Sequence, residues 1–209
     1  LLSTTRLTQQ KQETKSRASS DTGTATVRLD PATGSYFLND TFSVNIKVDT
    51  KSVEASGLQV YLSYTYTGNS PDIEVQDADT SKTGIQIQKG TIFESYTGNS
   101  VTVDAAAKKV TIGLAGYSTD SGYVSSGEGV FATINFVAKS LSPKVELTFD
   151  RALSKLQRKS DNQDVLLTPT SVGNYAVINR GGGAMKYYKC SGTSCVEDTS
   201  GGTAYANDN

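Results

Sequence analysis

The sequence has no histidine and no tryptophan, and its 209 residues include only two cysteines and four prolines. Histidine is the side chain that most often serves as a general base near neutral pH, and it is the commonest ligand of transition metals in proteins. Its absence excludes a Ser-His-Asp triad, a Cys-His pair and a histidine-ligated zinc site. The absence of tryptophan also counts against a carbohydrate-binding module.

The sequence also lacks an excess of basic or acidic residues. The 20 basic and 21 acidic residues give a formal net charge of −1. Binding of nucleic acid through bulk charge is therefore not expected, because neutralising phosphates requires a concentrated basic surface. No stretch is long and apolar enough to span a bilayer. The chain opens with Leu1 and Leu2 instead of Met, so a membrane link is expected only through an N-terminal anchor that precedes this sequence.

Acidic side chains are the remaining candidates for catalysis, because a pair of carboxylates can hydrolyse a glycosidic bond. Glu94, Asp104, Asp120 and Glu128 are available, but none of them lies in a recognisable motif. Acidic residues in the loops of all-β proteins usually serve to keep the surface solvated. We therefore expect no catalytic residues and a protein that is not an enzyme.

Alternation of apolar and polar residues is the main pattern in the chain. Residues 42–48, for example, read FSVNIKV, as in a strand with one buried face. Residues 130–138 carry apolar side chains on both faces, which predicts a central strand. The one helix-like stretch, 151–159, is expected to be a turn or loop. Short strands separated by frequent turns predict an all-β sandwich or jelly roll. Expected strands lie at residues 25–29, 42–48, 58–64, 73–75, 85–87, 101–103, 110–114, 130–138, 145–149, 165–167 and 175–178.

Composition divides the chain into three parts. Residues 1–22 are polar and are expected to form a stalk or a solvated helix. Residues 23–179 are expected to form the sandwich, and residues 180–209 a Gly-rich linker and a short tail. Cys190 and Cys195 lie in this tail and are expected to form a local disulfide in an oxidising compartment. The alternative is a pair of free thiols.

Four segments of the middle part resemble the cohesin family of β-sandwich modules. The most specific is residues 126–139, SGEGVFATINFVAK, because family members place a Gly-rich turn before an Ala-x-Ile-x-Phe strand. Residues 38–44, 56–64 and 145–149 are similar to three further strands of the family. The resemblance implies a sandwich of about nine strands that binds other proteins without catalysis. Residues 64–71 depart from the family pattern, so no partner-contacting residue is carried over.

A possible metal loop begins at Asp77. Asp77, Asp79 and Ser81 alternate as oxygen donors ahead of Gly84, as in a calcium-binding loop. The twelfth position is Gln88 instead of a bidentate acid, which favours a solvated turn. Calcium is therefore the weaker interpretation, and no other cofactor is expected.

Tyrosines are the candidate ligand contacts. Tyr61, Tyr66, Tyr117 and Tyr123 are suited to protein or sugar recognition, and the alternative is that they pair across strands within the sheet. We expect an extracellular or cell-surface module for protein–protein assembly or adhesion, such as a subunit of a filament or surface array. The alternative is a carbohydrate-binding module that presents tyrosines to a polysaccharide.

Overall fold

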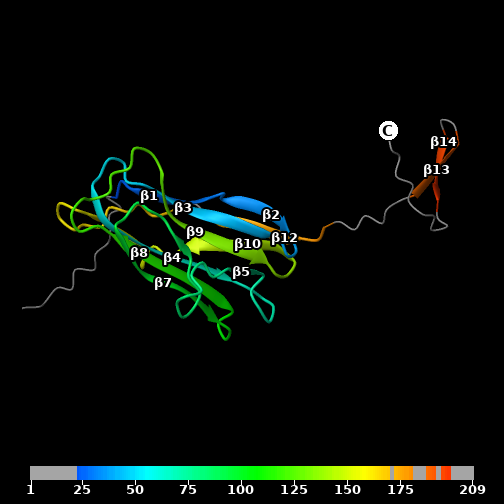
Figure 1. Cartoon of the computed structure of the whole chain (residues 1–209), viewed down its shortest axis with the longest axis horizontal. Helices are drawn as coiled ribbons and strands as arrows, with labels where there is room; N and C mark the ends of the chain where they lie inside the picture. Colours follow the sequence, from blue (N-terminus) through cyan, green and yellow to red (C-terminus); the bar gives the residue numbers. More distant parts are fainter. Residues whose placement is uncertain (1–22, 170–171, 181–186, 192–193, 199–209) are drawn as a thin grey trace, which may run out of the picture.

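A computed structural model describes residues 23–169, 172–180, 187–191 and 194–198 (Figure 1). Twelve strands form two sheets, two further strands form a separate hairpin, and these residues include no helix. The predicted all-β sandwich is confirmed, with more strands than the nine expected. The predicted stalk at 1–22 lies outside the described residues.

The five-stranded sheet is antiparallel throughout and has β9 at its centre. Strand β9 pairs with β3 on one side and with β5 and β6 on the other. The central position of β9 in the sheet was predicted correctly. No further layer buries its outer face, because its outward residues Thr133 and Asn135 are only half-buried. The strands are β1 (Thr26–Asp30), β3 (Thr41–Asp49), β9 (Gly129–Ala138), β5 (Ile73–Val75) and β6 (Gln88–Lys89).

The seven-stranded sheet has the order β2-β12-β10-β4-β8-β7, with β11 pairing alongside β4. Strand β2 pairs with β12 in parallel, and the other pairings are antiparallel. The strands are β2 (Thr33–Phe37), β12 (Gly173–Ile178), β10 (Ser142–Phe149), β4 (Ala55–Thr65), β8 (Lys109–Tyr117), β7 (Ser95–Asp104) and β11 (Lys155–Arg158).

The core lies between the inward faces of the two sheets. Phe136 on β9 is fully buried, and its ring centroid lies 5.2 Å from that of Phe42 on β3. It also lies 6.3 Å from the ring of Tyr64 on β4, in the opposite sheet. These contacts follow from the alternation, because every second residue of each strand points into the sandwich.

The sequence missed β2, β6 and β11 and overpredicted two strands. Residues 85–87 and 165–167 form only isolated bridges, through Ile85 and Leu166. The segment before β12 makes separate backbone contacts, in which Val165 N–H donates to the Leu156 carbonyl and Leu167 N–H to the Ala25 carbonyl. The Asp164 carboxylate adds to these by accepting hydrogen bonds from the backbone N–H of Leu156 and Leu166. The apolar residues at 165–167 therefore indicate burial of Val165 and Leu166 without a continuous strand pairing.

A charged cluster joins β1 to the turn before β9. The Arg28 guanidinium donates two hydrogen bonds to the Glu128 carboxylate, at 2.5 Å each. It also lies 3.2 Å from Asp30, which pairs with Lys47 at 2.7 Å. Hydrogen bonding from Arg28 lowers the pKa of Glu128, and hydrogen bonding from Lys47 and then Arg28 lowers that of Asp30.

These lowered pKa values predict an acid-sensitive contribution to stability. A carboxylate with a depressed folded-state pKa stabilises the fold above its unfolded pKa, about 4 for Asp and Glu, and loses that effect as pH falls through the folded-state value. Glu128→Gln should therefore cost about 0.5–1 kcal/mol near pH 7, as expected for a partly exposed pair, and almost nothing near pH 2. Urea denaturation at both pH values measures this, with Arg28→Gln as the matched variant. An equal cost at both pH values would contradict it.

Candidate functional site

The outward polar groups of the five-stranded sheet bond to one another. Ser43 Oγ donates to Asn135 Oδ1 at 2.7 Å, across β3 and β9. Thr133 Oγ1 donates to Asn45 Oδ1 at 2.8 Å across the same two strands. Together with the Arg28 cluster, these pairs satisfy much of the hydrogen-bonding capacity of that face within the protein itself.

The outer face of β4, β8 and β7 differs. In the described part of the chain, no side-chain to side-chain hydrogen bond or ion pair joins β4 to β8, or β8 to β7. Small and hydroxyl-bearing residues predominate, and the charged residues Lys109 and Asp104 are register partners at one end of the strands. We call this surface the β4–β8–β7 face. Its outward residues are Gln59, Tyr61, Ser63, Thr111, Gly113, Ala115, Tyr117, Thr97, Ser100 and Thr102.

Two of the four candidate tyrosines lie on this face. Tyr61 is the register partner of Gly113, and a Cβ atom at Gly113 would lie 2.8 Å from Tyr61 Cε1. The Tyr61 ring therefore extends over the glycine of the neighbouring strand. Tyr117 pairs with Gly57 and is 45% exposed. The face thus carries a half-buried ring and an exposed ring above a floor of small residues.

The other two tyrosines belong elsewhere. Tyr66 is only 4% exposed, and Lys108 Nζ lies 5.6 Å from its ring centroid. Tyr123 is half-buried, and its ring centroid lies 5.9 Å from that of Phe93. Tyr66 is thus part of the core and unavailable to a ligand, which corrects its assignment as a contact residue, and Tyr123 packs mainly against the core.

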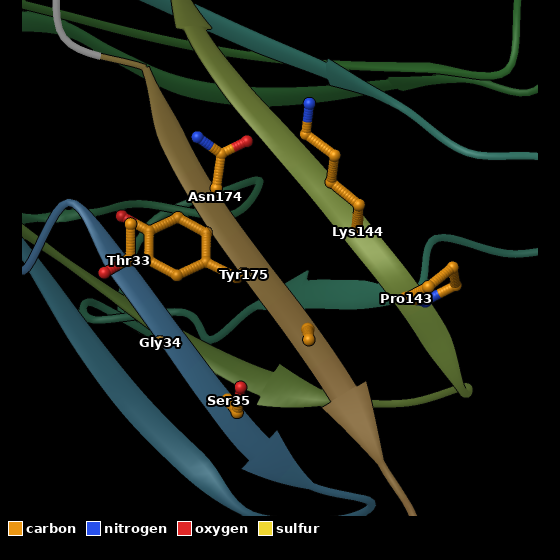
Figure 2. A pocket seen from close by; sticks show the side chains of 8 residues that line it. Thr33, Gly34, Ser35, Pro143, Lys144, Asn174 and Tyr175 are labelled. Carbon is orange, nitrogen blue, oxygen red and sulfur yellow. The ribbon is translucent and has the colours of Figure 1, made fainter.

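Two shallow grooves lie on the seven-stranded sheet. One, of about 300 Å³, lies over β2, β12 and β10 and presents the hydroxyls of Thr33 and Ser35 and the side chains of Asn174 and Lys144 (Figure 2). Asn174 Oδ1 is buried and has no hydrogen-bond partner among the described residues. The other groove, of about 160 Å³, lies beside Tyr117 and is also lined by Gln59, Lys155 and Gln157.

The candidate calcium loop uses its oxygens within the turn. Asp77 Oδ1 accepts hydrogen bonds from the backbone N–H of Asp79 at 3.1 Å and of Gln86 at 3.0 Å. Asp79 Oδ1 accepts from Ser81 Oγ at 2.5 Å, and this bond and the nearby Lys82 lower the pKa of Asp79. In the part of the chain that the structure describes, no three acidic or cysteine side chains gather in a metal-binding arrangement.

Three of the four acidic residues considered for catalysis, Glu94, Asp104 and Glu128, each make a separate local contact. Glu94 accepts hydrogen bonds from Thr119, and Asp104 accepts from the backbone of Ala106 and Ala107. Glu128 is paired with Arg28. Each of these three carboxylates holds a different turn or strand end, so Glu94, Asp104 and Glu128 do not form an acid pair with one another.

The cysteines lie on the separate hairpin, formed by β13 (Tyr187–Ser191) and β14 (Ser194–Asp198). Cys190 and Cys195 are direct partners in the antiparallel register. Their side chains lie outside the described residues. In either type of antiparallel pair, partner Cα atoms are about 4.5–5.5 Å apart, which is compatible with a disulfide.

Within the described residues, no helix could span a membrane. No family model and no curated protein matches the sequence. Among solved structures, the chain is similar to the cohesin CaCohA2 of Clostridium acetobutylicum, which was solved in complex with a dockerin. The two chains have 16% sequence identity and a TM-score of 0.53, and the match covers 74% of this chain and 100% of the other.

Two further cohesins give similar values. The OlpC cohesin of Clostridium thermocellum, also in a cohesin–dockerin complex, has 18% identity and a TM-score of 0.51, covering 75% of this chain and 95% of its own. A non-cellulosomal cohesin from the archaeon Archaeoglobus fulgidus has 13% identity and a TM-score of 0.50, covering 76% and 94%. At such identities the likeness concerns the fold, and the chain has the fold of cohesin domains.

Proposed function

We propose that this protein is a non-catalytic module that binds another protein through the β4–β8–β7 face. The observation that carries the proposal is the contrast between the two outer faces. The five-stranded sheet bonds its polar groups to one another, whereas the β4–β8–β7 face presents hydroxyls and two tyrosines without such bonds. Tyrosine is enriched at protein interfaces, where its ring contributes contact area and its hydroxyl a hydrogen bond.

The fold supports a protein partner. Two of the similar cohesins were solved in complex with dockerins. The partner of this chain is expected to present a flat, largely uncharged surface, because the centre of the β4–β8–β7 face has small residues and hydroxyls. Charge steering should accordingly contribute little to association.

Site-specific photo-crosslinking tests the proposal. A benzoylphenylalanine placed at Thr111, at the centre of the β4–β8–β7 face, should give a discrete crosslinked adduct with a partner from the source organism. The same group at Ser43, on the five-stranded sheet, is the matched control and should give none. An excess of unlabelled protein should suppress the adduct. Adducts of equal yield at both positions would contradict the proposed face.

Carbohydrate binding is the second candidate, and the Tyr61 ring favours it. A ring that extends over Gly113 can present its other side to a sugar, and Gln59 and Gln157 border the neighbouring groove. Isothermal titration with soluble polysaccharides tests this candidate. Saturable heat that is lost in Tyr61→Ala would support it, and its absence with every polysaccharide would leave the protein partner as the function.

We further propose that the protein works outside the cell and that Cys190 and Cys195 form a disulfide. Their register supports this pairing, and the enclosed loop is so short that the bridge would stabilise only the hairpin. Mass spectrometry of the secreted protein should give a mass two hydrogens lower before reduction than after it. Cys190→Ser with Cys195→Ser should leave thermal unfolding of the sandwich unchanged. Free thiols in the secreted protein would contradict the pairing.

We also propose that the protein assembles with further copies of itself into a filament or surface array. Strand β1 leads directly into β2, and β12 runs parallel to β2 with Ile178 beside Phe37. Residues 23 and 180, the first and last described residues of the sandwich, therefore lie at opposite ends of it (Figure 1). A chain shortened to residues 23–180 should fold and stay monomeric in light scattering, whereas the full chain should form an oligomer. Equal masses per particle in both samples would contradict the role of the flanking segments.

A further inference from the structure

Strand β2 is an edge of the seven-stranded sheet, and only one of its two sides is paired. Its partner is β12, which lies beside it in parallel register from Thr33 to Phe37 (Figure 2). Strand β3, which follows β2 in the chain, belongs to the other sheet and pairs there with β1 and β9. In the described part of the chain, no strand therefore pairs with the second side of β2.

The backbone hydrogen bonds show which residues of β2 point to this second side. At one end of the strand, Asn174 N–H donates to the Ala32 carbonyl at 2.8 Å. At the other end, Leu38 N–H donates to the Ile178 carbonyl at 3.0 Å. Backbone groups alternate in direction along a strand. The even-numbered residues of β2 therefore face β12, and the odd-numbered residues face away from it.

Two of the three odd-numbered residues have free backbone groups. Phe37 is satisfied by the turn that follows, because its carbonyl accepts from Asp40 N–H at 2.9 Å and its N–H donates to the Asp40 carboxylate at 3.3 Å. Thr33 and Ser35 are exposed, and their N–H and C=O groups have no hydrogen-bond partner among the described residues. The edge thus presents two donors and two acceptors in a row.

The other sheet edges have features that hinder pairing with a further strand. Strand β7 has a register shift and is partly covered, since Val101 N–H donates to the Ile85 carbonyl at 3.2 Å. Strand β1 carries the charged side chains of Arg28 and Asp30. Strands β5 and β6 have only three and two residues. Residues 33–37 of β2 read TGSYF, without a charge or a proline, and pair with β12 in an unbroken register.

We infer that β2 pairs antiparallel with β2 of a second copy of this chain, across a two-fold axis at Gly34. Thr33 then lies opposite Ser35 of the second copy, and Ser35 lies opposite Thr33 of that copy. Each is a hydrogen-bonded pair that exchanges two N–H···O bonds, so all the free groups of both copies are satisfied. Gly34 places no side chain at the axis, where the Cα atoms come closest, about 4.5 Å apart. This match of the edge with itself is what an isologous contact requires and identifies a second copy as the occupant.

The pairing is expected to be weak. Four hydrogen bonds along a five-residue strand correspond to a Kd on the order of 1 mM. The chain shortened to residues 23–180 therefore stays monomeric at the micromolar concentrations of light scattering, and the contact becomes effective where copies are concentrated. The β2 edge is separate from the β4–β8–β7 face and from the flanking segments, so the inference depends on neither.

Disulfide trapping in the full chain tests the register, with Cys190→Ser and Cys195→Ser as the background. A Thr33→Cys chain mixed with a Ser35→Cys chain in a glutathione redox buffer should give a covalent dimer. Cα atoms of a hydrogen-bonded antiparallel pair are about 5.5 Å apart, which a disulfide bridges. Either chain alone places its two cysteines roughly 8–9 Å apart and should give at least about tenfold less dimer. Equal yields in the mixture and in the single chains, or no dimer in any sample, would overturn the inference.

A proline on the same edge tests the backbone hydrogen bonds. Ser35→Pro in the Thr33→Cys chain removes an N–H that points to the second copy and leaves the pairing with β12 intact, because proline is tolerated where a strand edge faces solvent. The yield of dimer with the Ser35→Cys chain should fall at least about tenfold. Ser35→Ala in the Thr33→Cys chain is the matched control: it retains the N–H and should leave the yield unchanged. An undiminished yield with Ser35→Pro in a chain whose thermal unfolding matches that of the control, or an equal loss with Ser35→Ala, would overturn the inference.

Discussion

Replacing Phe136 with alanine is expected to lower the free energy of unfolding by about 3–5 kcal/mol. The side chain is 0% exposed. Its ring contacts Phe42 within its own sheet and Tyr64 in the opposite sheet, at centroid distances of 5.2 and 6.3 Å. Truncation therefore removes buried apolar area and leaves a cavity where both sheets meet, since the paired strands on either side of β9 cannot close in. Equilibrium denaturation in urea measures this loss.

Val124→Ala is the control for that experiment. Val124 is 49% exposed, so its truncation should change stability by no more than about 0.5 kcal/mol. A similar loss in both variants would mean that Phe136 does not occupy the centre of the core. Phe136→Ala could be unfolded already in buffer without denaturant. This outcome agrees with the expectation if Phe136→Leu, which retains most of the side-chain volume, is folded.

Thr111→Arg is expected to weaken binding of the partner at least about a hundredfold, because a bulky charge at the centre of an interface prevents close packing and is left unpaired. Thr111 lies between Ser63 of β4 and Thr102 of β7 in the register. Its side chain points outward, so that the core is not affected and stability should change by less than about 1 kcal/mol. Surface plasmon resonance with the crosslinked partner measures the affinity.

Ser43→Arg is the matched control for binding, because it places the same side chain on the outer face of the other sheet. Ser43 is exposed and loses only its hydrogen bond to Asn135. The affinity of this variant should match that of the wild-type protein. If Ser43→Arg abolished binding and Thr111→Arg did not, the partner would dock on the five-stranded sheet, and the proposed face would be wrong.

The sandwich separates stability from recognition in a simple way. Inward residues such as Phe136 and Leu62 are fixed by packing, and substitutions there act on folding. Outward residues of β8, such as Thr111, contact neither the core nor the opposite sheet. The β4–β8–β7 face can therefore vary in sequence at little cost in stability, which suits a module that must distinguish one partner from others.

The alternation of apolar residues determined which strands form and which side chains face inward. Residues 42–48 and 130–138 were predicted as strands from their period alone, because burial of every second residue is a local property of a strand. The same rule, extended by one step beyond Tyr64, would have placed Tyr66 in the core with Val60 and Leu62. The sequence therefore contained the signal that removes Tyr66 from the candidate contacts.

The order of the strands was decided only by tertiary structure. Strand β2 lies parallel to β12, so that Phe37 pairs with Ile178 from the far end of the domain, and β11 pairs with β4 although residues 151–159 looked helix-like. Such pairings depend on contacts between distant segments, whose register has no local signature. The position of Tyr61 over Gly113, and with it the character of the β4–β8–β7 face, depends on the register of β4 and β8. The sequence determined that Tyr61 points outward, and only the packing of neighbouring strands decided what lies beneath it.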